Sequence, residues 1–368
     1  MKVLQILPEL IQGGVERGTL DLARELVKRG HDSHVISAGG PMVQKLLDEG
    51  SIHHLLPVHK KSFLSLKYVR PLRALILELS PDVIHVRSRL PAWLTKLALR
   101  KIPLQSRPAL VTTVHGLYSV NAYSAVMTQA DRVISISHTV TQYIRDNYPK
   151  VAPANIKLIH RCVDPDEFPV GYQPDEQWFA DFYRDHPQLE NKQLILFPGR
   201  ITRWKGHKFV LDLMAVLKTQ EHDIHALVVG SAHAKKQGFY QELLQQVEER
   251  GLAEHISFLG ARSDMKELYA ASSLALNLSD QPEPFGRTVI EAICVGLPVV
   301  AWDQGGPGEV LRLCYPRGLV PYADIPALAK TVTEVLKDPG NVELSDDFKL
   351  DTLVEKTLAV YTEAMESR

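Results

Sequence analysis

Short apolar runs rich in β-branched residues alternate with amphipathic stretches along the whole of this 368-residue chain. Runs that do not themselves alternate apolar with polar residues are typical of parallel strands covered on both faces. The pattern predicts strands at Lys2–Leu7, His34–Ser37, Ile52–Pro57, Val83–Val86, Leu110–Val114, Arg132–Ser135, Ile156–Ile159, Gln193–Phe197, Ala226–Gly230, Ile256–Leu259, Leu274–Leu278 and Pro298–Ala301, with a shorter one at Gly318–Val320.

The alternation of strands and helices is interrupted once, between Pro165 and Leu189, where proline, aspartate and aromatic residues gather. A chain of this length also exceeds what one hydrophobic core usually spans. We therefore expect an α/β protein with two tandem Rossmann-like, doubly wound domains facing each other across a cleft, at 1–165 and 190–350. Residues 166–189 would connect them, and a last helix within 351–368 can return to complete the first domain.

The composition is that of a folded globular protein, with 45% of residues apolar and 23% charged. The N-terminal segment lacks a cleavage signature, and no run approaches the length of a membrane span. The three cysteines form no CxxC pair, which is typical of free thiols in a reducing compartment. We expect a cytoplasmic protein, either free or peripheral on the inner face of the cytoplasmic membrane, with no nucleic-acid partner.

The positive charge is concentrated in the first half of the chain. Residues 1–170 contain 22 Lys and Arg against 14 Asp and Glu, and the remainder contains 20 against 29. Within the basic half, the stretch Lys60–Arg73 mixes cations with apolar side chains. This pattern suits peripheral contact with an anionic membrane or an anionic acceptor. It equally suits a solvated helix whose apolar residues enter the core.

Two carboxylates flank the start of a predicted helix in EPFGRTVIE, which runs from Glu283 to Glu291. Pro284 and Gly286 favour a tight loop, so Glu283 precedes the helix start and Glu291 lies inside the helix. Such a segment can offer carboxylates to ligand hydroxyls and unpaired backbone N–H groups to an anion. The alternative is a surface helix with a capping carboxylate.

Two cations follow the strand predicted at Gln193–Phe197. Arg200 and Lys205 lie in a strand-to-helix loop, where Gly199 and Gly206 allow close approach of a ligand to the backbone. A guanidinium beside an ammonium suits a diphosphate. The order of residues excludes a P-loop, because the glycine follows the lysine. Two solvated surface cations are the alternative.

The first half contributes a second set of candidates. Gly13 and Gly14 lie at a strand-to-helix turn, without the GxGxxG spacing of a nicotinamide dinucleotide site. His115 follows a strand, at the sheet edge where open α/β sheets bind ligands. The DxD pattern of Asp164 and Asp166 could hold a metal, but it falls in the expected connection and no metal is expected there.

These motifs occur together in one order: GG near the start, HG after a central strand, GR…KG at the start of the second half, and E-x7-E containing PFG. In this combination the chain resembles the family-4 retaining glycosyltransferases of GT-B fold, which use nucleotide-diphosphate sugars. The segment PFGRTVIEA is similar to bacterial members that build lipopolysaccharide or other surface polysaccharides. The resemblance implies sugar transfer from a nucleotide sugar to a hydroxyl of a glycan or lipid-linked acceptor, without cofactor or metal.

The resemblance also implies catalytic roles. Arg200 and Lys205 would hold the diphosphate and neutralise the leaving group. Glu283 would bind hydroxyls of the transferred sugar, and Glu291 those of the ribose. His115 would contact the donor sugar near its reacting carbon.

Further donor contacts would come from backbone N–H groups, with Gly13 and Gly14 near the donor phosphate or acceptor and Phe285 and Gly286 near the sugar. Two positions depart from the family pattern. Arg161 and Cys162 stand where Asn-Gly is frequent, and this change suggests an acceptor role for Arg161. Arg287 stands where Leu or Asn is common.

Two other functions remain compatible with the sequence. A sugar-nucleotide epimerase of the same fold would turn over donor without an acceptor. A non-catalytic module that binds sugar nucleotides or docks on a membrane would bind donor without turnover.

Overall fold

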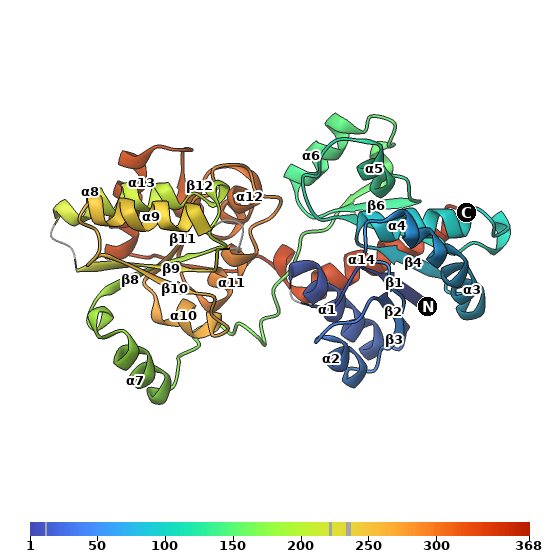
Figure 1. The fold of residues 1–368 in the computed structure, drawn as a ribbon, viewed down its shortest axis with the longest axis horizontal. Helices are drawn as coiled ribbons and strands as arrows, with labels where there is room; N and C mark the ends of the chain where they lie inside the picture. Colours follow the sequence, from blue (N-terminus) through green and yellow to red (C-terminus); the bar gives the residue numbers. More distant parts are fainter. Residues whose placement is uncertain (12, 221–222, 233–236) are drawn as a thin grey trace. The chain divides into compact units, whose positions relative to one another are not determined.

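The computed structural model describes residues 1–11, 13–220, 223–232 and 237–368, which form two compact units. One unit contains Met1–Cys162 together with Leu350–Arg368, and the other contains Val163–Lys349 (Figure 1).

The first unit is built on a seven-stranded sheet in the order β3-β2-β1-β4-β5-β6-β7, and its strand pairs are parallel. Because the chain starts in the middle and winds outward in both directions, β1 and β4 flank the point where strand order reverses. The strands are β1 (Lys2–Ile6), β2 (Asp32–Ser37), β3 (Ile52–Leu55), β4 (Val83–Val86), β5 (Ala109–Val114), β6 (Arg132–Ser135) and β7 (Ile156–Leu158).

The helices of this unit bury one apolar stripe each against the sheet. Helix α1, for example, buries Leu20, Leu22, Ala23 and Leu26. The helices are α1 (Gly14–Lys28), α2 (Val43–Asp48), α3 (Val69–Leu79), α4 (Arg89–Leu99), α5 (Ala122–Ala125), α6 (His138–Asn147) and α14 (Leu350–Glu366), with a 3₁₀ helix η1 (Phe63–Tyr68) before α3.

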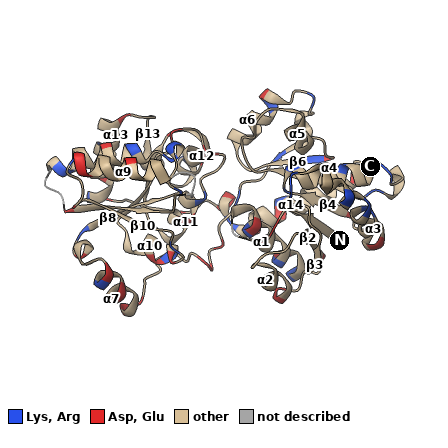
Figure 2. Cartoon of the chain, viewed as in Figure 1, with Lys and Arg blue, Asp and Glu red and all other residues tan. Residues whose placement is uncertain are grey.

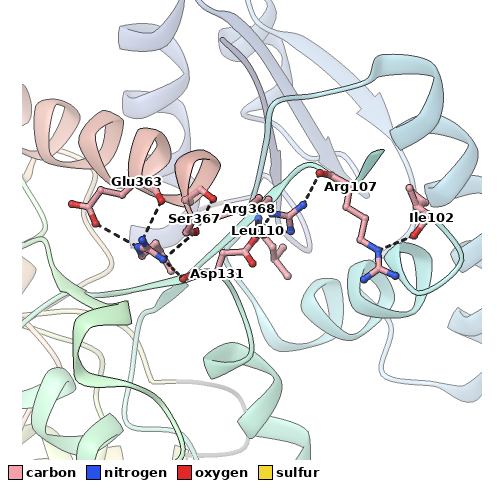
Figure 3. A network of polar contacts seen from close by, with 9 residues as sticks. Ile102, Arg107, Leu110, Asp131, Glu363, Ser367 and Arg368 are labelled. Atoms are coloured by element: carbon pink, nitrogen blue, oxygen red, sulfur yellow. Dashed lines mark hydrogen bonds and ion pairs between the residues drawn. The ribbon is translucent and has the colours of Figure 1, made fainter. Parts of the chain in front are cut away.

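Helix α14, from the far end of the chain, belongs to the core of the first unit. Its Val354 and Tyr361 are fully buried in the cluster that contains Val3 and Val83 from the central strands. Its end is fixed by polar contacts with the edge of the sheet (Figure 3): Arg368 bonds Asp131 at 2.7 Å and the Arg107 carbonyl at 2.5 Å.

The second unit repeats the design with six parallel strands in the order β10-β9-β8-β11-β12-β13. Figure 1 shows α8, α9 and α13 on one face of this sheet and α7, α10 and α11 on the other. The elements are α7 (Glu176–Asp185), β8 (Gln193–Pro198), η6 (Arg203–Lys205), α8 (His207–Leu217), β9 (Ile224–Val229), α9 (Gln237–Glu249), β10 (Ile256–Gly260), α10 (Met265–Ala271), β11 (Leu274–Asn277), α11 (Arg287–Val295), β12 (Val299–Trp302), α12 (Gly305–Cys314), β13 (Leu319–Val320) and α13 (Ile325–Lys337).

All the predicted strands are present, and the expectation of two Rossmann-like α/β domains is confirmed. The division of the chain differs from the expected one, because residues 166–189 belong to the second unit and do not form a separate connection. Helix α7 in this segment stacks Trp178 on Phe182 with ring centroids 4.8 Å apart. The Trp178 indole also donates to Asp264 at 2.9 Å, so aromatic packing holds the segment in place.

Candidate active site

A buried ion pair lies where β8 and β11 end in the second unit. Lys205 Nζ is 2.8 Å from Glu283 Oε1, and the two side chains are 15% and 9% exposed. The direction of Lys205 depends on Gly206, whose φ is 82° and whose Cα faces the Leu278 carbonyl so closely that a Cβ would come within 1.7 Å of it. Only glycine fits this turn, which explains the KG sequence.

The Glu283 carboxylate is held asymmetrically. Asn277 Nδ2 donates to Oε1 at 3.1 Å, and the Ser279 hydroxyl donates to the same oxygen. Among the residues the structure describes, none donates to Oε2, which stays available as an acceptor for ligand hydroxyls. Glu283 is therefore a positioned carboxylate, and its interpretation as a helix cap is wrong, because no side chain caps α11.

The loop between Glu283 and α11 presents backbone where a ligand can approach. Gly286 precedes α11 with φ 105°, and a Cβ there would lie 2.9 Å from Pro307. The Phe285 side chain is buried, with its ring centroid 6.0 Å from that of Phe348. It thus anchors the loop and leaves only its backbone for a ligand. The N–H of Gly306 donates to the Glu283 carbonyl at 2.8 Å, so the glycines that begin α12 support this loop.

Glu291 lies on α11 with both carboxylate oxygens engaged. Arg287 Nε lies 2.7 Å from Oε1, and the Tyr269 hydroxyl donates to Oε2 at 3.1 Å. Burial and the nearby Glu291 raise the pKa of Tyr269 well above its usual value, so it remains a proton donor. Arg287, flagged as a departure from the family, therefore holds the carboxylate predicted to bind ribose.

Arg200 is exposed in the loop after β8, and no described residue pairs with it. Lys205, in contrast, is nearly buried and paired with Glu283, so the alternative of two solvated surface cations does not describe it. A guanidinium free at the carboxyl edge of the sheet can bind an anion without first breaking an internal pair.

The remaining candidates lie together in the first unit. Helix α1 begins at Gly14 without a side-chain cap on Gly13. A Cβ on Gly14 would lie 2.8 Å from Arg161 Nη1, so the glycine lets this guanidinium reach the helix start. His115 follows β5, and neither of its ring nitrogens has a hydrogen-bond partner among the described residues. Burial, then the charges of Arg161 and Arg87, hold its pKa well below the usual value, so the ring is neutral.

Several contacts of this site were not predicted. Asn277, Ser279 and Tyr269 contact the two carboxylates, but the sequence around them contains no motif. One signal could have located Asn277. It lies at the end of a predicted strand, β11, and in the sheet this strand is the neighbour of β8, which precedes Lys205. In the DxD segment, the Asp164 side chain accepts from the Asp166 backbone N–H at 3.0 Å, as in a local turn.

Comparison with known families agrees with this geometry. Residues 12–167 match the sequence model named Glycosyltransferase Family 4, and residues 180–350 match the one named Glycosyl transferases group 1. The chain is a family-4 glycosyltransferase of the GT-B fold.

Three individual proteins illustrate the similarity. A glycosyltransferase structure from Rickettsia africae ESF-5 superposes with a TM-score of 0.85 at 27% identity, covering 100% of this chain and 99% of that one. The N-acetyl-alpha-D-glucosaminyl L-malate synthase of Bacillus anthracis is 25% identical over 86% of this chain and 83% of its own. Anabaena HepE in complex with UDP-glucose shares the fold, with a TM-score of 0.78 at 22% identity and coverage of 100% of both chains.

In this glycosyltransferase none of the described helices is long and apolar enough to cross a bilayer. Its cysteines are free thiols, and burial raises the pKa of Cys314 to about 11 and that of Cys294 to about 12. Both buried thiols are therefore un-ionised at neutral pH.

Proposed function

We propose that this glycosyltransferase moves a sugar from a nucleoside-diphosphate donor to a hydroxyl of a glycan or lipid-linked acceptor, with retention at the anomeric carbon. The carrying observation is the Lys205–Glu283 pair, which places an ammonium beside a carboxylate that has one unengaged oxygen. The ammonium can bind a diphosphate, and the unengaged carboxylate oxygen can accept from a sugar hydroxyl. The HepE complex with UDP-glucose supports a donor of this class.

The chemistry requires stabilisation of the leaving group. As the glycosidic bond breaks, negative charge builds on the departing diphosphate and positive charge on the anomeric carbon. Arg200, Lys205 and the free N–H groups at the start of α11 are the donors positioned for the diphosphate. Glu283 would orient the sugar through its hydroxyls, and Glu291 would take the ribose hydroxyls. No cofactor or metal has a role in this proposal.

The first experiment identifies the donor. Thermal-shift measurements against uridine-, guanosine- and adenosine-diphosphate sugars select the nucleotide, and release of nucleoside diphosphate with acceptor extract then reports turnover. Lys205→Ala and Arg200→Ala should each lower turnover at least a hundredfold, as expected when one charged donor to the transition state is lost.

Arg203→Ala is the matched control, because Arg203 lies in the same loop but forms an exposed pair with Glu242. It should turn over normally. Near-normal turnover by Lys205→Ala, or loss by Arg203→Ala as large as that by Lys205→Ala, would contradict the proposal. Turnover of donor without acceptor would favour the epimerase, and activity abolished by chelator and restored by magnesium would assign the DxD segment a metal.

We also infer that the first unit contacts an anionic membrane through Lys60–Arg73. This stretch has five cations, and residues 60–77 contain no Asp or Glu. Figure 2 shows the cations in blue on and before α3. The alternative, a solvated helix whose apolar residues enter the core, describes α3, which buries Leu72 and Ile76. It does not describe η1, in which Phe63 and Leu64 are 92% and 76% exposed.

An apolar cavity of about 480 Å³ lies beside these exposed residues, and its lining includes Phe63, Leu66, Trp93, Leu94 and Tyr123. A hydrocarbon chain fits such a lining, while the neighbouring lysines suit lipid phosphates. The proposed location is the inner face of the cytoplasmic membrane, where a lipid-linked precursor of a surface polysaccharide would be available. The similarity of the PFGRTVIEA segment to bacterial lipopolysaccharide enzymes supports this role.

Co-sedimentation with vesicles tests the contact. The protein should bind vesicles containing phosphatidylglycerol better than pure phosphatidylcholine, and the double variant Phe63→Ser, Leu64→Ser should lose this binding. Leu104→Ser is the control, because Leu104 is also 76% exposed but lies outside the stretch. Equal binding of both variants would contradict the membrane contact.

A further inference from the structure

The half-buried ring of Trp204 lies beside the ammonium of Lys205 in η6, the turn that follows β8. Lys205 Nζ lies over this ring, 4.7 Å from its centroid, and is also 2.8 Å from Glu283 Oε1. A cation at this distance from an indole centroid is attracted by the π face. Among the described residues, the ring and the carboxylate are the only hydrogen-bond or cation–π partners of the ammonium.

A backbone hydrogen bond fixes Trp204 relative to the loop that carries Glu283. The N–H of Asp280 donates to the Trp204 carbonyl at 2.7 Å. The Asp280 carboxylate is itself held, because it accepts from the Tyr322 hydroxyl at 2.9 Å. Ser279, the residue before Asp280, donates to the Glu283 carboxylate. The two partners of the Lys205 ammonium are therefore carried by segments that are bonded to each other.

The aliphatic part of Lys205 is confined as well. A Cβ on Gly199, the residue after β8, would lie 3.6 Å from Lys205 Cδ, so the lysine side chain runs along this backbone. A lysine loses much of its rotamer freedom when its side chain is fixed. Because the folded protein has already fixed Lys205, a ligand that binds the ammonium does not have to order it.

An aromatic ring suits this position better than a second carboxylate would. A carboxylate would restrain the ammonium more strongly, but it would also place a negative charge where a diphosphate has to bind. The face of an indole attracts a cation through its quadrupole and carries no net charge. The attraction is greatest for a cation removed from water, and the Lys205 side chain is only 15% exposed.

We propose that Trp204 is a positioning residue, whose ring holds the Lys205 ammonium where the donor diphosphate binds. The inference rests on the proposed function, in which Lys205 binds the diphosphate, and it adds a residue that acts on this ligand through Lys205. Arg203 provides the contrast within the same turn. Its guanidinium lies 4.7 Å from the centroid of the Phe239 ring, but it pairs with Glu242 at the surface.

A double-mutant cycle on ligand binding tests the inference. Calorimetry measures binding of the nucleoside diphosphate chosen in the thermal-shift screen to the wild type, Trp204→Leu, Lys205→Ala and the double variant. Trp204→Leu should weaken binding by at least about fivefold when Lys205 is present and by less than about twofold in the Lys205→Ala background. Trp204→Phe, which keeps a π face, should recover most of the loss. A merely structural role would weaken binding equally in both backgrounds.

Phe239→Leu is the matched control, because it removes the ring beside Arg203, and it should bind within about twofold of the wild type. If Trp204→Leu does not fold, Trp204→Met replaces it. If Lys205→Ala binds too weakly to titrate, the order of affinity from wild type through Trp204→Phe to Trp204→Leu is the test.

Three results would overturn the inference: wild-type affinity in Trp204→Leu, equal losses in Trp204→Phe and Trp204→Leu, or equal losses from Trp204→Leu in both backgrounds. Wild-type affinity in Lys205→Ala would overturn the donor assignment as well. A loss on Lys205→Ala, combined with a Trp204→Leu effect that is independent of Lys205, would overturn the role of Trp204 alone.

Discussion

At the scale of single residues, the Lys205–Glu283 pair joins two motifs that are 78 positions apart in the sequence. The pair is nearly buried, so removing one partner leaves the other charge without compensation. Glu283 accepts three hydrogen bonds on one oxygen, and the other oxygen is the part of the site that can distinguish a nucleotide sugar from a bare nucleotide.

Glu283→Gln should therefore weaken binding of the selected nucleotide sugar much more than binding of the matching nucleoside diphosphate. The glutamine amide keeps the shape of the side chain but lacks the negative charge that orients Lys205. It also replaces one of the two carboxylate oxygens, which accept hydrogen bonds, with an NH2 group that cannot accept from a sugar hydroxyl. Calorimetric titration with both ligands measures the difference, which we expect to be at least tenfold. Glu242→Gln, which disrupts only the exposed Arg203 pair, serves as control. Equal losses for sugar nucleotide and nucleotide would contradict the role assigned to Glu283.

Lys205, Glu283 and Glu291 could be proposed from the sequence because each lies in a local motif that glycine and proline define, and their roles stay predictions. The sequence did not indicate Asn277 and Ser279, since their contacts depend on which strands become neighbours in the sheet.

At the scale of elements, the junction between β8 and α8 shapes the site. Gly206 takes a left-handed conformation against the carbonyl of Leu278, the residue that follows β11, and β11 is a neighbour of β8 in the sheet. His207 begins α8 immediately after Gly206. His207 is buried, with its ring edge-on to Phe197 of β8 at 5.0 Å between centroids. The end of this loop is therefore held in place by close packing at Gly206 and His207.

Gly206→Ala should lower the free energy of unfolding by at least about 2 kcal/mol, because alanine is strained at positive φ and its Cβ would overlap the Leu278 oxygen. Urea denaturation measures the change. Gly238→Ala is the control: it lies within α9, where nothing is within 4 Å of an added Cβ, and alanine favours helix. A Gly206→Ala protein as stable as Gly238→Ala would show that the turn is not constrained.

His207 should make the second unit sensitive to acid. Burial, and then the charge of Lys205, lower its pKa from 6.5 to about 4 in the folded protein. Between pH 6.5 and 4 the unfolded chain therefore binds a proton that the folded one does not, and the free energy of unfolding falls by up to about 3 kcal/mol.

Above pH 6.5 both states are neutral and this effect is absent. His207→Leu should flatten the pH profile of unfolding in that window. The stability difference between wild type and His207→Leu should shift in favour of the variant as pH falls. A difference that does not change between pH 6.5 and 4 would contradict the assigned pKa.

Strands were predictable at this scale because buried parallel strands have a continuous apolar composition that polar turns interrupt. Helix α7 was not predicted, because Pro174 and Asp175 before it are typical of a loop. Its aromatic residues are explained only by the folded structure, in which Trp178 packs on Phe182 and donates to Asp264. Helix α14 was predicted, but its place against β5 depends on contacts with residues several hundred positions earlier.

At the scale of the whole molecule, each unit has its own sheet and core, and the chain returns to the first through α14. Tyr361 of α14 also bonds the buried His85 of β4 at 2.7 Å. Each large apolar side chain buried from this helix contributes about 1.5–3 kcal/mol, so several of them equal a large part of a domain's stability.

Deleting Leu350–Arg368 should unfold the first unit and leave the second able to bind nucleotide. Limited proteolysis would show cleavage confined to residues 1–162, and the thermal shift with nucleoside diphosphate would persist. Arg368→Ala, which removes partly exposed contacts with Asp131 and the Arg107 carbonyl, should change stability by less than about 1 kcal/mol. A protease-resistant first unit in the deletion variant would contradict the assignment of α14 to its core.

The most direct test of the account is a crystal structure of the protein with its donor nucleotide sugar bound. It should show the diphosphate within hydrogen-bonding distance of Lys205 Nζ and the Arg200 guanidinium, with a sugar hydroxyl on Oε2 of Glu283. A diphosphate bound away from both cations would contradict the proposed mechanism.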